Sequence, residues 1–109
     1  MEIIAVPKID WESVSLKLYE LRVHNLNLRR YVCFYTRNHG DCHSLNCLDC
    51  KKNMDRAISQ SELGEALGWG LSSIQNWETG RSKPSIEVLI YYAQICQISL
   101  EEILGVNLP

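Results

Sequence analysis

Residues 58–80 read ISQSELGEALGWGLSSIQNWETG, and their capping residues predict two short helices joined by a tight turn. Ser59 and Glu62 have the spacing of a capping box, in which each side chain satisfies a backbone N–H at the start of a helix. Gly68 follows the apolar residues Leu63 and Leu67 and is suited to end this helix in the left-handed conformation.

The second helix is expected from about Leu71 to Glu78. Its apolar residues Ile74 and Trp77 are spaced to face inward, and Gly80 is placed to end it. A pair of helices joined by a glycine-containing turn is a helix-turn-helix, which holds its second helix on an outer surface of the domain.

Two more helices are expected downstream of this pair. Pro84 and Ser85 precede a helical pattern over residues 86–96. Ser99 and Glu102 then form a second capping box before a last short helix, which Gly105 ends.

Upstream of the pair, residues 11–37 predict one long, largely continuous helix with Asp10 as its N-cap. Its apolar residues recur at spacings of three, four and seven, namely Val14, Leu18, Leu21, Leu28, Val32 and Tyr35. The alternative is a break near Asn25 and Asn27, because asparagine lowers helix propensity.

Length and composition fit one globular domain over residues 1–109. The fold class is therefore all-α, with about five helices. No apolar run reaches the ~18 residues of a membrane span, and the first residues lack the charge pattern of a secretory signal. We expect a cytoplasmic protein. The net charge is −2, but residues 17–56 carry eight Lys/Arg against four Asp/Glu, so basic charge is concentrated in the middle of the chain.

Residues 58–105 resemble the Cro/C1-type (XRE-type) helix-turn-helix family of transcriptional regulators. The resemblance rests on residues 58–68, on SSIQNWETG at 72–80, on Lys83-Pro84 and on LEEIL at 100–104. It implies a lambda-repressor-like bundle that binds double-stranded DNA sequence-specifically, as a regulator and more specifically a repressor. It also implies a homodimer on a pseudo-palindromic site, because one short helix reads few bases.

The second helix of the pair is then the one that enters the major groove. The residues expected to read bases are Leu71, Ser72, Gln75 and Asn76. The residues expected to contact phosphates are Gln60, Ser73, Arg81, Ser82 and Lys83. No Arg or Lys lies on the reading face, which favours A·T base pairs over guanine. Gly64 stands where the family usually has Ala, which weakens that helix by up to about 1 kcal/mol.

A cysteine-bearing, basic insertion over residues 38–53 separates the first helix from the pair, since Arg22 and Gln60 are 38 positions apart. Cys47 and Cys50 have the Cys-x-x-Cys spacing of a zinc site, and Cys42 lies five residues upstream. We predict a structural zinc ion held by Cys33, Cys42, Cys47 and Cys50, with His39 and His43 as alternative ligands. Metal binding would order a segment too polar to pack alone. Cys96 is expected to be a buried small hydrophobe.

Two other functions remain open. One is an antitoxin-like or accessory protein-interaction module, and the other is a metal- or redox-responsive regulator that senses through residues 33–50. We expect no enzyme activity, because no group orients a nucleophile beside a base, and no small-molecule substrate is evident.

The segments expected to form the contact between the two copies of the dimer are residues 1–10, the long first helix and residues 106–109.

Overall fold

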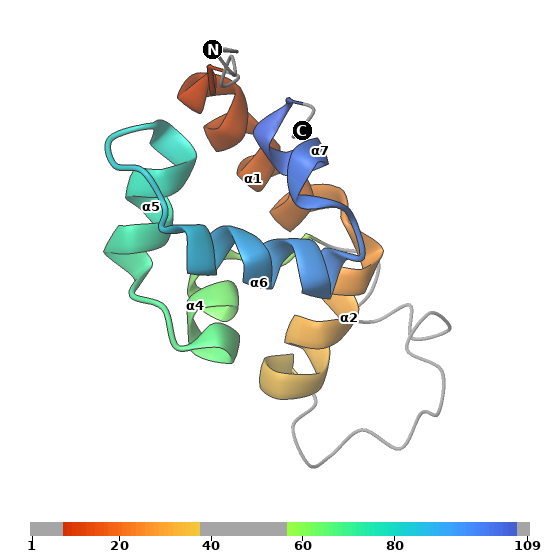
Figure 1. Ribbon diagram of the computed structural model, residues 1–109. Coiled ribbons are helices and arrows are strands. Elements are labelled where there is room, and N and C mark those ends of the chain that lie inside the picture. Colours follow the sequence, from red (N-terminus) through yellow and green to blue (C-terminus); the bar gives the residue numbers. More distant parts are fainter. Residues whose placement is uncertain (1–7, 38–56, 107–109) are drawn as a thin grey trace, which may run out of the picture.

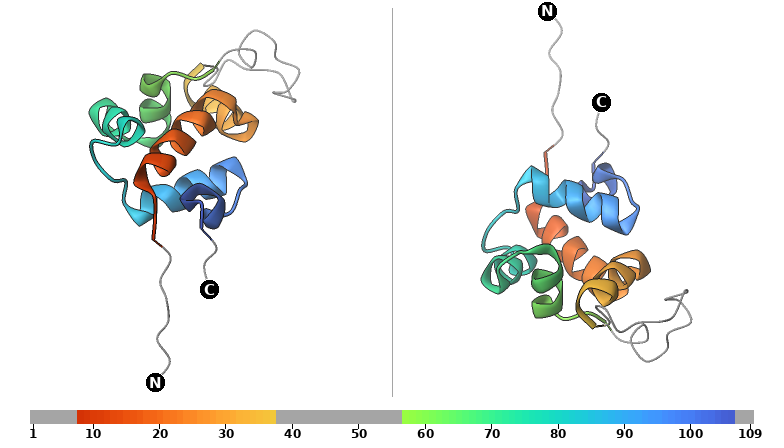
Figure 2. Two further views of the ribbon diagram at one scale, coloured as in Figure 1. Left: turned by 90° about the horizontal axis from the view of Figure 1, so that it is seen from above. Right: turned by 90° about the horizontal axis from the view of Figure 1, so that it is seen from below.

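The computed structural model describes residues 8–37 and 57–106, and this part of the chain contains helices and no strands. The α-helices are α1 (Trp11–His24), α2 (Leu26–Val32), α4 (Gln60–Leu67), α5 (Leu71–Thr79), α6 (Ile86–Cys96) and α7 (Leu100–Leu104), and the π-helix η1 (Cys33–Arg37) continues α2. The expected all-α class is confirmed. Figure 1 labels these helices, and Figure 2 shows α1 through the middle, with α4 and α5 on one side of it and α6 and α7 on the other.

One core joins these helices. Its buried members are Val14, Leu18, Leu21, Leu28, Val32, Ile58, Leu63, Ile74, Leu89, Tyr92, Ala93, Cys96, Ile103 and Leu104. Each of the six described α-helices contributes at least one of these residues, so the helices are stabilised by packing against one another. The predicted apolar positions of residues 11–32 are thereby confirmed, whereas Tyr35, at the end of that pattern, is 44% exposed.

The prediction of one long first helix is wrong, because α1 ends at His24 and α2 begins at Leu26. The alternative, a break near Asn25 and Asn27, is confirmed. Asn25 has an extended backbone (φ −76°, ψ 117°), and its side-chain oxygen accepts the N–H of Leu28 at 2.9 Å, which caps α2. The amides of Asn25 and Asn27 both donate to the carbonyl oxygen of Cys96 at 3.3 Å. Local capping and this tie to the end of α6 together outweigh helix continuity.

The predicted caps of the later helices are present. Ser59 and Glu62 form both bonds of the capping box, and the Ser99 hydroxyl accepts the N–H of Glu102 at 3.1 Å. Gly68 (φ 72°) and Gly80 (φ 79°) end α4 and α5 in the left-handed conformation that glycine tolerates. None of the helices in the described ranges is both long and apolar enough to cross a membrane.

Gly64 is a packing requirement as well as a weak helix former. A Cβ atom at this position would lie 2.5 Å from the carbonyl oxygen of Trp69 and 3.3 Å from Cδ1 of Ile74. The Gly64 carbonyl also accepts the N–H of Trp69 at 2.9 Å. The chain thus turns back against α4 at a distance that alanine does not permit, which corrects the expectation that this glycine only weakens the helix.

Candidate nucleic-acid interface

The inner side of α5 is fixed by apolar packing. Ile74 is completely buried, and Trp77 meets Trp69 edge-to-face with ring centroids 5.4 Å apart. Trp69, in the turn between α4 and α5, also packs on the buried ring of Tyr92 from α6, with centroids 5.3 Å apart. These aromatic contacts set the angle between the two helices, as the helix-turn-helix geometry requires.

The outer side of α5 carries the residues predicted to read bases. Leu71 is 43% exposed, Ser72 and Gln75 are exposed, and Asn76 is partly buried. Ser73, predicted to contact phosphate, is also exposed. The helix therefore presents a short polar row with hydrogen-bonding groups that have room to meet a ligand.

The turn after α5 carries the predicted phosphate-binding cations. Arg81, Ser82 and Lys83 are all exposed, and the Asn76 carbonyl accepts the N–H of Arg81 at 2.9 Å and of Ser82 at 3.3 Å. Lys83 Nζ lies 5.2 Å from the centre of the Trp11 ring, a cation–π contact with the start of α1. The backbone bonds and this contact hold the turn beside the polar row of α5.

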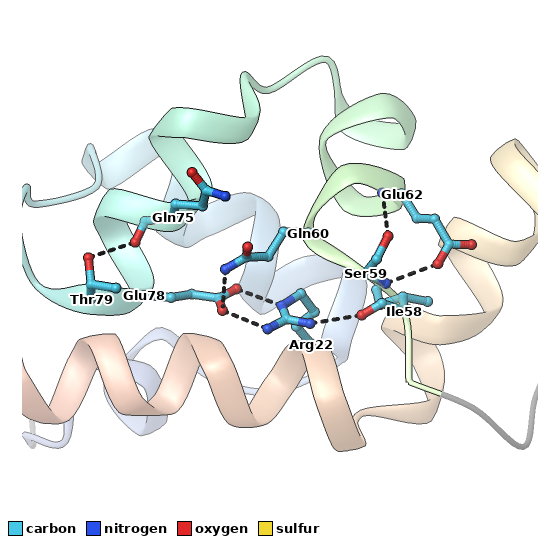
Figure 3. Close-up of polar contacts among 8 residues, drawn as sticks. All are labelled: Arg22, Ile58, Ser59, Gln60, Glu62, Gln75, Glu78 and Thr79. Carbon is cyan, nitrogen blue, oxygen red and sulfur yellow. Dashed lines mark hydrogen bonds and ion pairs between the residues drawn. The ribbon is translucent and has the colours of Figure 1, made fainter.

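An ion pair that the sequence did not suggest ties α5 to α1 (Figure 3). Arg22 Nε donates to Glu78 Oε2 at 2.8 Å and Arg22 Nη2 to Glu78 Oε1 at 2.9 Å, a two-bond fork. The two side chains are 12% and 3% exposed. This hydrogen bonding raises the pKa of the Arg22 guanidinium further above its ordinary value.

Two more bonds extend this pair into a network. Arg22 Nη1 donates to the Ile58 carbonyl at 2.9 Å, and Gln60 Nε2 donates to Glu78 Oε1 at 3.1 Å. Figure 3 shows the four residues converging between α1, α4 and α5. One sequence signal for the network exists: Arg22 lies four residues after Leu18, beside the apolar side of α1. A charge there needs a buried partner.

Gln60, predicted to contact phosphate, therefore has a second role in the structure. Its amide nitrogen is engaged with Glu78 and its side chain is partly buried, at the first residue of α4. The amide oxygen and the backbone N–H groups of the first helical turn are the groups that remain suited to a phosphate.

Of the predicted zinc ligands, the structure describes Cys33 alone. Its side chain is 1% exposed, where α2 passes into η1. Cys42, Cys47, Cys50, His39 and His43 lie outside the described residues. Within the described ranges, no three His, Cys, Asp or Glu side chains gather as metal ligands. The zinc site stays a prediction.

Cys96 is the buried small hydrophobe that was expected, with an exposed fraction of 1%. Burial raises the pKa of its thiol to about 12, so the thiol is neutral at physiological pH. A neutral, buried thiol is neither a nucleophile nor a metal ligand.

A family model described as helix-turn-helix matches residues 53–103. The match begins at the last residue of the cysteine-bearing insertion, after Cys50, and covers α4 to α7 almost to the end of α7. Comparison with curated proteins and with solved structures gives no significant match. The matched family consists of DNA-binding regulators, which are usually not enzymes. The matched segment, the helix pair and the polar outer row of α5 agree: residues 53–103 form a helix-turn-helix segment of the Cro/C1 type.

Proposed function

We propose that this protein is a sequence-specific regulator that reads double-stranded DNA with α5 in the major groove. The observation that carries this proposal is the outer row of α5. Ser72 and Gln75 are exposed on a helix whose other side is immobilised by Ile74 and Trp77 and whose last turn is held by the Arg22–Glu78 pair. A rigid helix with free polar side chains loses little entropy on docking to base edges.

The side chains of this row suit A·T base pairs. Gln75 and Asn76 have amides that can make paired hydrogen bonds to adenine, and Leu71 has a methyl-bearing tip that fits beside the thymine methyl group. Ser72 can donate to or accept from either kind of pair. The sequence of α5 contains no Arg or Lys, the residues that most often recognise guanine.

Phosphate binding is assigned to the rim of the row. Arg81, Ser82 and Lys83 lie in the turn after α5, Ser73 lies in its first turn, and Gln60 starts α4. The two cations should dominate the salt dependence, since each phosphate neutralised adds about −0.9 to the slope of log affinity against log salt. Such contacts fix register and add affinity for any sequence.

As a regulator the protein would act as a repressor and as a homodimer on a pseudo-palindrome. Two copies of α5 in successive major grooves require half-sites about 10 base pairs apart. Repression is the simpler of the two regulatory roles, because a protein that occupies its DNA site blocks access to that site without further activity.

A structural zinc ion held by Cys33, Cys42, Cys47 and Cys50, with His39 and His43 as alternative ligands, belongs to the same proposal. Zinc would supply the folding energy for the segment that carries these residues. The Arg22–Ile58 bond favours a second candidate function, a metal-responsive regulator. Ile58 is close to the end of that segment, and Arg22 contacts both its carbonyl and Glu78 of α5.

The proposal is tested by selecting bound DNA from a random pool, with and without a strong chelator. We expect enrichment of a symmetric, A·T-rich site, and weaker binding after metal removal if zinc braces the fold. Gln75→Ala should lower discrimination at one base pair by about 1–3 kcal/mol while leaving affinity for unrelated DNA unchanged, which serves as the internal control. A pool with no enriched sequence would refute DNA reading by α5. Guanine-rich half-sites would refute the A·T preference, and elemental analysis without stoichiometric metal would refute zinc.

A further inference from the structure

An apolar surface formed by α2, η1 and α6 is not used by the proposed DNA contacts. Its exposed members are Phe34 (59%), Tyr35 (44%), Ile86 (55%), Ile90 (41%) and Tyr91 (54%). Tyr31 joins them, with its ring 4.7 Å from that of Tyr35. We name these six residues the α2–α6 face.

The α2–α6 face is continuous. A depression lined by Tyr31, Phe34 and Tyr35 shares Tyr31 with a second depression, which Tyr91 also lines. Tyr91 in turn borders a third depression with Ile90. Ile86 lies one helical turn before Ile90, on the same side of α6. The apolar side chains therefore form one band along α6 and across to η1.

The band carries few charged side chains. Arg30 lines the depression at the α2 end, and Glu87 lines the depression that also holds Ile90 and Tyr91. A surface rich in aromatic side chains and poor in charges is the composition typical of a protein–protein interface. Aromatic side chains also dominate binding energy there, because they bury much area for little conformational entropy.

The exposed area is of the size that a dimer needs. Phe34, Tyr35 and Tyr91 each leave about 100 Å² in solvent, taking roughly 200 Å² for a whole aromatic side chain. With the two isoleucines the five side chains expose roughly 450 Å². A stable interface buries about 800 Å² per partner, of which somewhat more than half, or about 450 Å², is apolar. The band thus matches the apolar part of one standard interface.

The position of the band leaves α5 accessible. Figure 2 shows α6 on the opposite side of α1 from α4 and α5, and in Figure 1 α5 lies near the N-terminal end of α6. A twofold axis that runs along α6 keeps the N-terminal ends of both α6 helices, and with them both α5 helices, on the same side of a dimer. That arrangement is the one that two neighbouring major grooves demand.

We infer that the α2–α6 face binds a second copy of this chain, an inference that rests on the proposed reading of a symmetric site. The two copies pack through like surfaces about a twofold axis along α6, with Tyr91 and Ile90 near the centre. Contact between copies is thereby assigned to α6 and to residues 31–35, the last part of the range predicted as one long first helix, rather than to residues 1–10, α1 or residues 106–109.

The test is the mass of the full-length protein in solution without DNA, measured by analytical ultracentrifugation from about 1 to 100 μM, a range that spans ordinary dimer affinities. The variants are Ile90→Glu and Tyr91→Glu, with Leu16→Glu as the matched control. Leu16 is 57% exposed in the middle of α1 and lies outside the band. Circular dichroism checks that each variant is folded. The rings of Tyr91 and Trp69 are in contact, with centroids 6.4 Å apart, so Tyr91→Glu can also disturb the fold. If circular dichroism shows that Tyr91→Glu is unfolded, the result for Ile90→Glu decides the test.

We expect the unaltered protein to have twice the mass of one chain, and Ile90→Glu and Tyr91→Glu to weaken self-association by about tenfold or more. Leu16→Glu should change it by less than about twofold. A monomer at about 100 μM, or equal weakening by Leu16→Glu, would overturn the inference while leaving DNA reading by α5 intact. If the protein is a dimer but selection from a random DNA pool enriches no site, the proposed function is overturned instead.

A photocross-linker in place of Gln94, which borders the band, identifies the occupant directly. A covalent dimer joined at α6 or η1 of the second copy supports the inference. A cross-link confined to residues 38–56 of the same chain would overturn it.

Discussion

Glu78→Gln tests whether the network behind α5 stabilises the fold and places the reading helix. The glutamate carboxylate accepts two bonds from Arg22, at 2.8 and 2.9 Å, and one from Gln60 at 3.1 Å. An amide of the same shape accepts at one atom only and points its own N–H groups at these donors. The substitution therefore removes the charge and breaks at least one bond without creating a cavity.

The expected cost follows from burial. Removing one partner of a buried ion pair costs about 3–5 kcal/mol, because the other charge stays desolvated. We take the lower end, about 3 kcal/mol, since Arg22 is 12% exposed and keeps its bond to Ile58. With a urea m-value near 1.5 kcal/mol/M, the unfolding midpoint falls by roughly 2 M.

The assay is urea unfolding followed by circular dichroism at pH 7, with Glu20→Gln as control. Glu20 is an exposed glutamate on α1, so its substitution should change the free energy of unfolding by less than about 0.5 kcal/mol. The double variant with Arg22→Met should be at least about 1 kcal/mol more stable than the sum of the single effects, because the two side chains interact. If Glu78→Gln and Glu20→Gln differ by less than about 0.5 kcal/mol, the reasoning from burial is refuted.

Three further substitutions test single features of the fold. Gly64→Ala should destabilise by about 1–2 kcal/mol despite its better helix propensity, because its Cβ would lie 2.5 Å from the Trp69 carbonyl; a raised urea midpoint contradicts this. Tyr92→Phe should leave stability unchanged or raise it by up to about 1 kcal/mol, since the buried hydroxyl has no hydrogen-bond partner among the described residues; a loss above about 1 kcal/mol in thermal unfolding would disprove it. The pKa of Asp10 is lowered in the folded protein, chiefly by the hydrogen bond from the Ser13 hydroxyl. Its carboxylate therefore stabilises α1 fully above the unfolded-state pKa, near 4, and this contribution is lost as the pH falls through the lower pKa of the folded state. Asp10→Asn should flatten the stability profile between about pH 5 and 2, and an unchanged acid limb refutes this role.

The helix pair was predictable from the sequence because its signals are local. The bonds of Ser59 with Glu62 and the left-handed turns at Gly68 and Gly80 each depend on residues within four positions of one another. The outer row of α5 followed from the same periodicity, since Ile74 and Trp77 fix which side faces inward.

The features that sequence reasoning missed depend on distant partners. The break at Asn25, which the sequence offered only as the alternative to a continuous helix, is stabilised by the Cys96 carbonyl, 71 positions away. The Arg22–Glu78 pair, which was not predicted, spans 56 positions. Gly64 was interpreted as a weak point because the approach of the Trp69 carbonyl is a tertiary contact. Helix propensity depends on the residue and its neighbours along the chain, whereas these three features depend on tertiary contacts with distant residues.

The single guanidinium that holds both the Ile58 carbonyl and Glu78 has a thermodynamic consequence. Any ligand of residues 33–56 that changes DNA affinity through Arg22 obeys reciprocal linkage: DNA must change the affinity for that ligand by the same factor. A metal that tightens operator binding tenfold is itself held tenfold more tightly on the operator. The operator would then retain metal that the same protein gives up when it is off DNA.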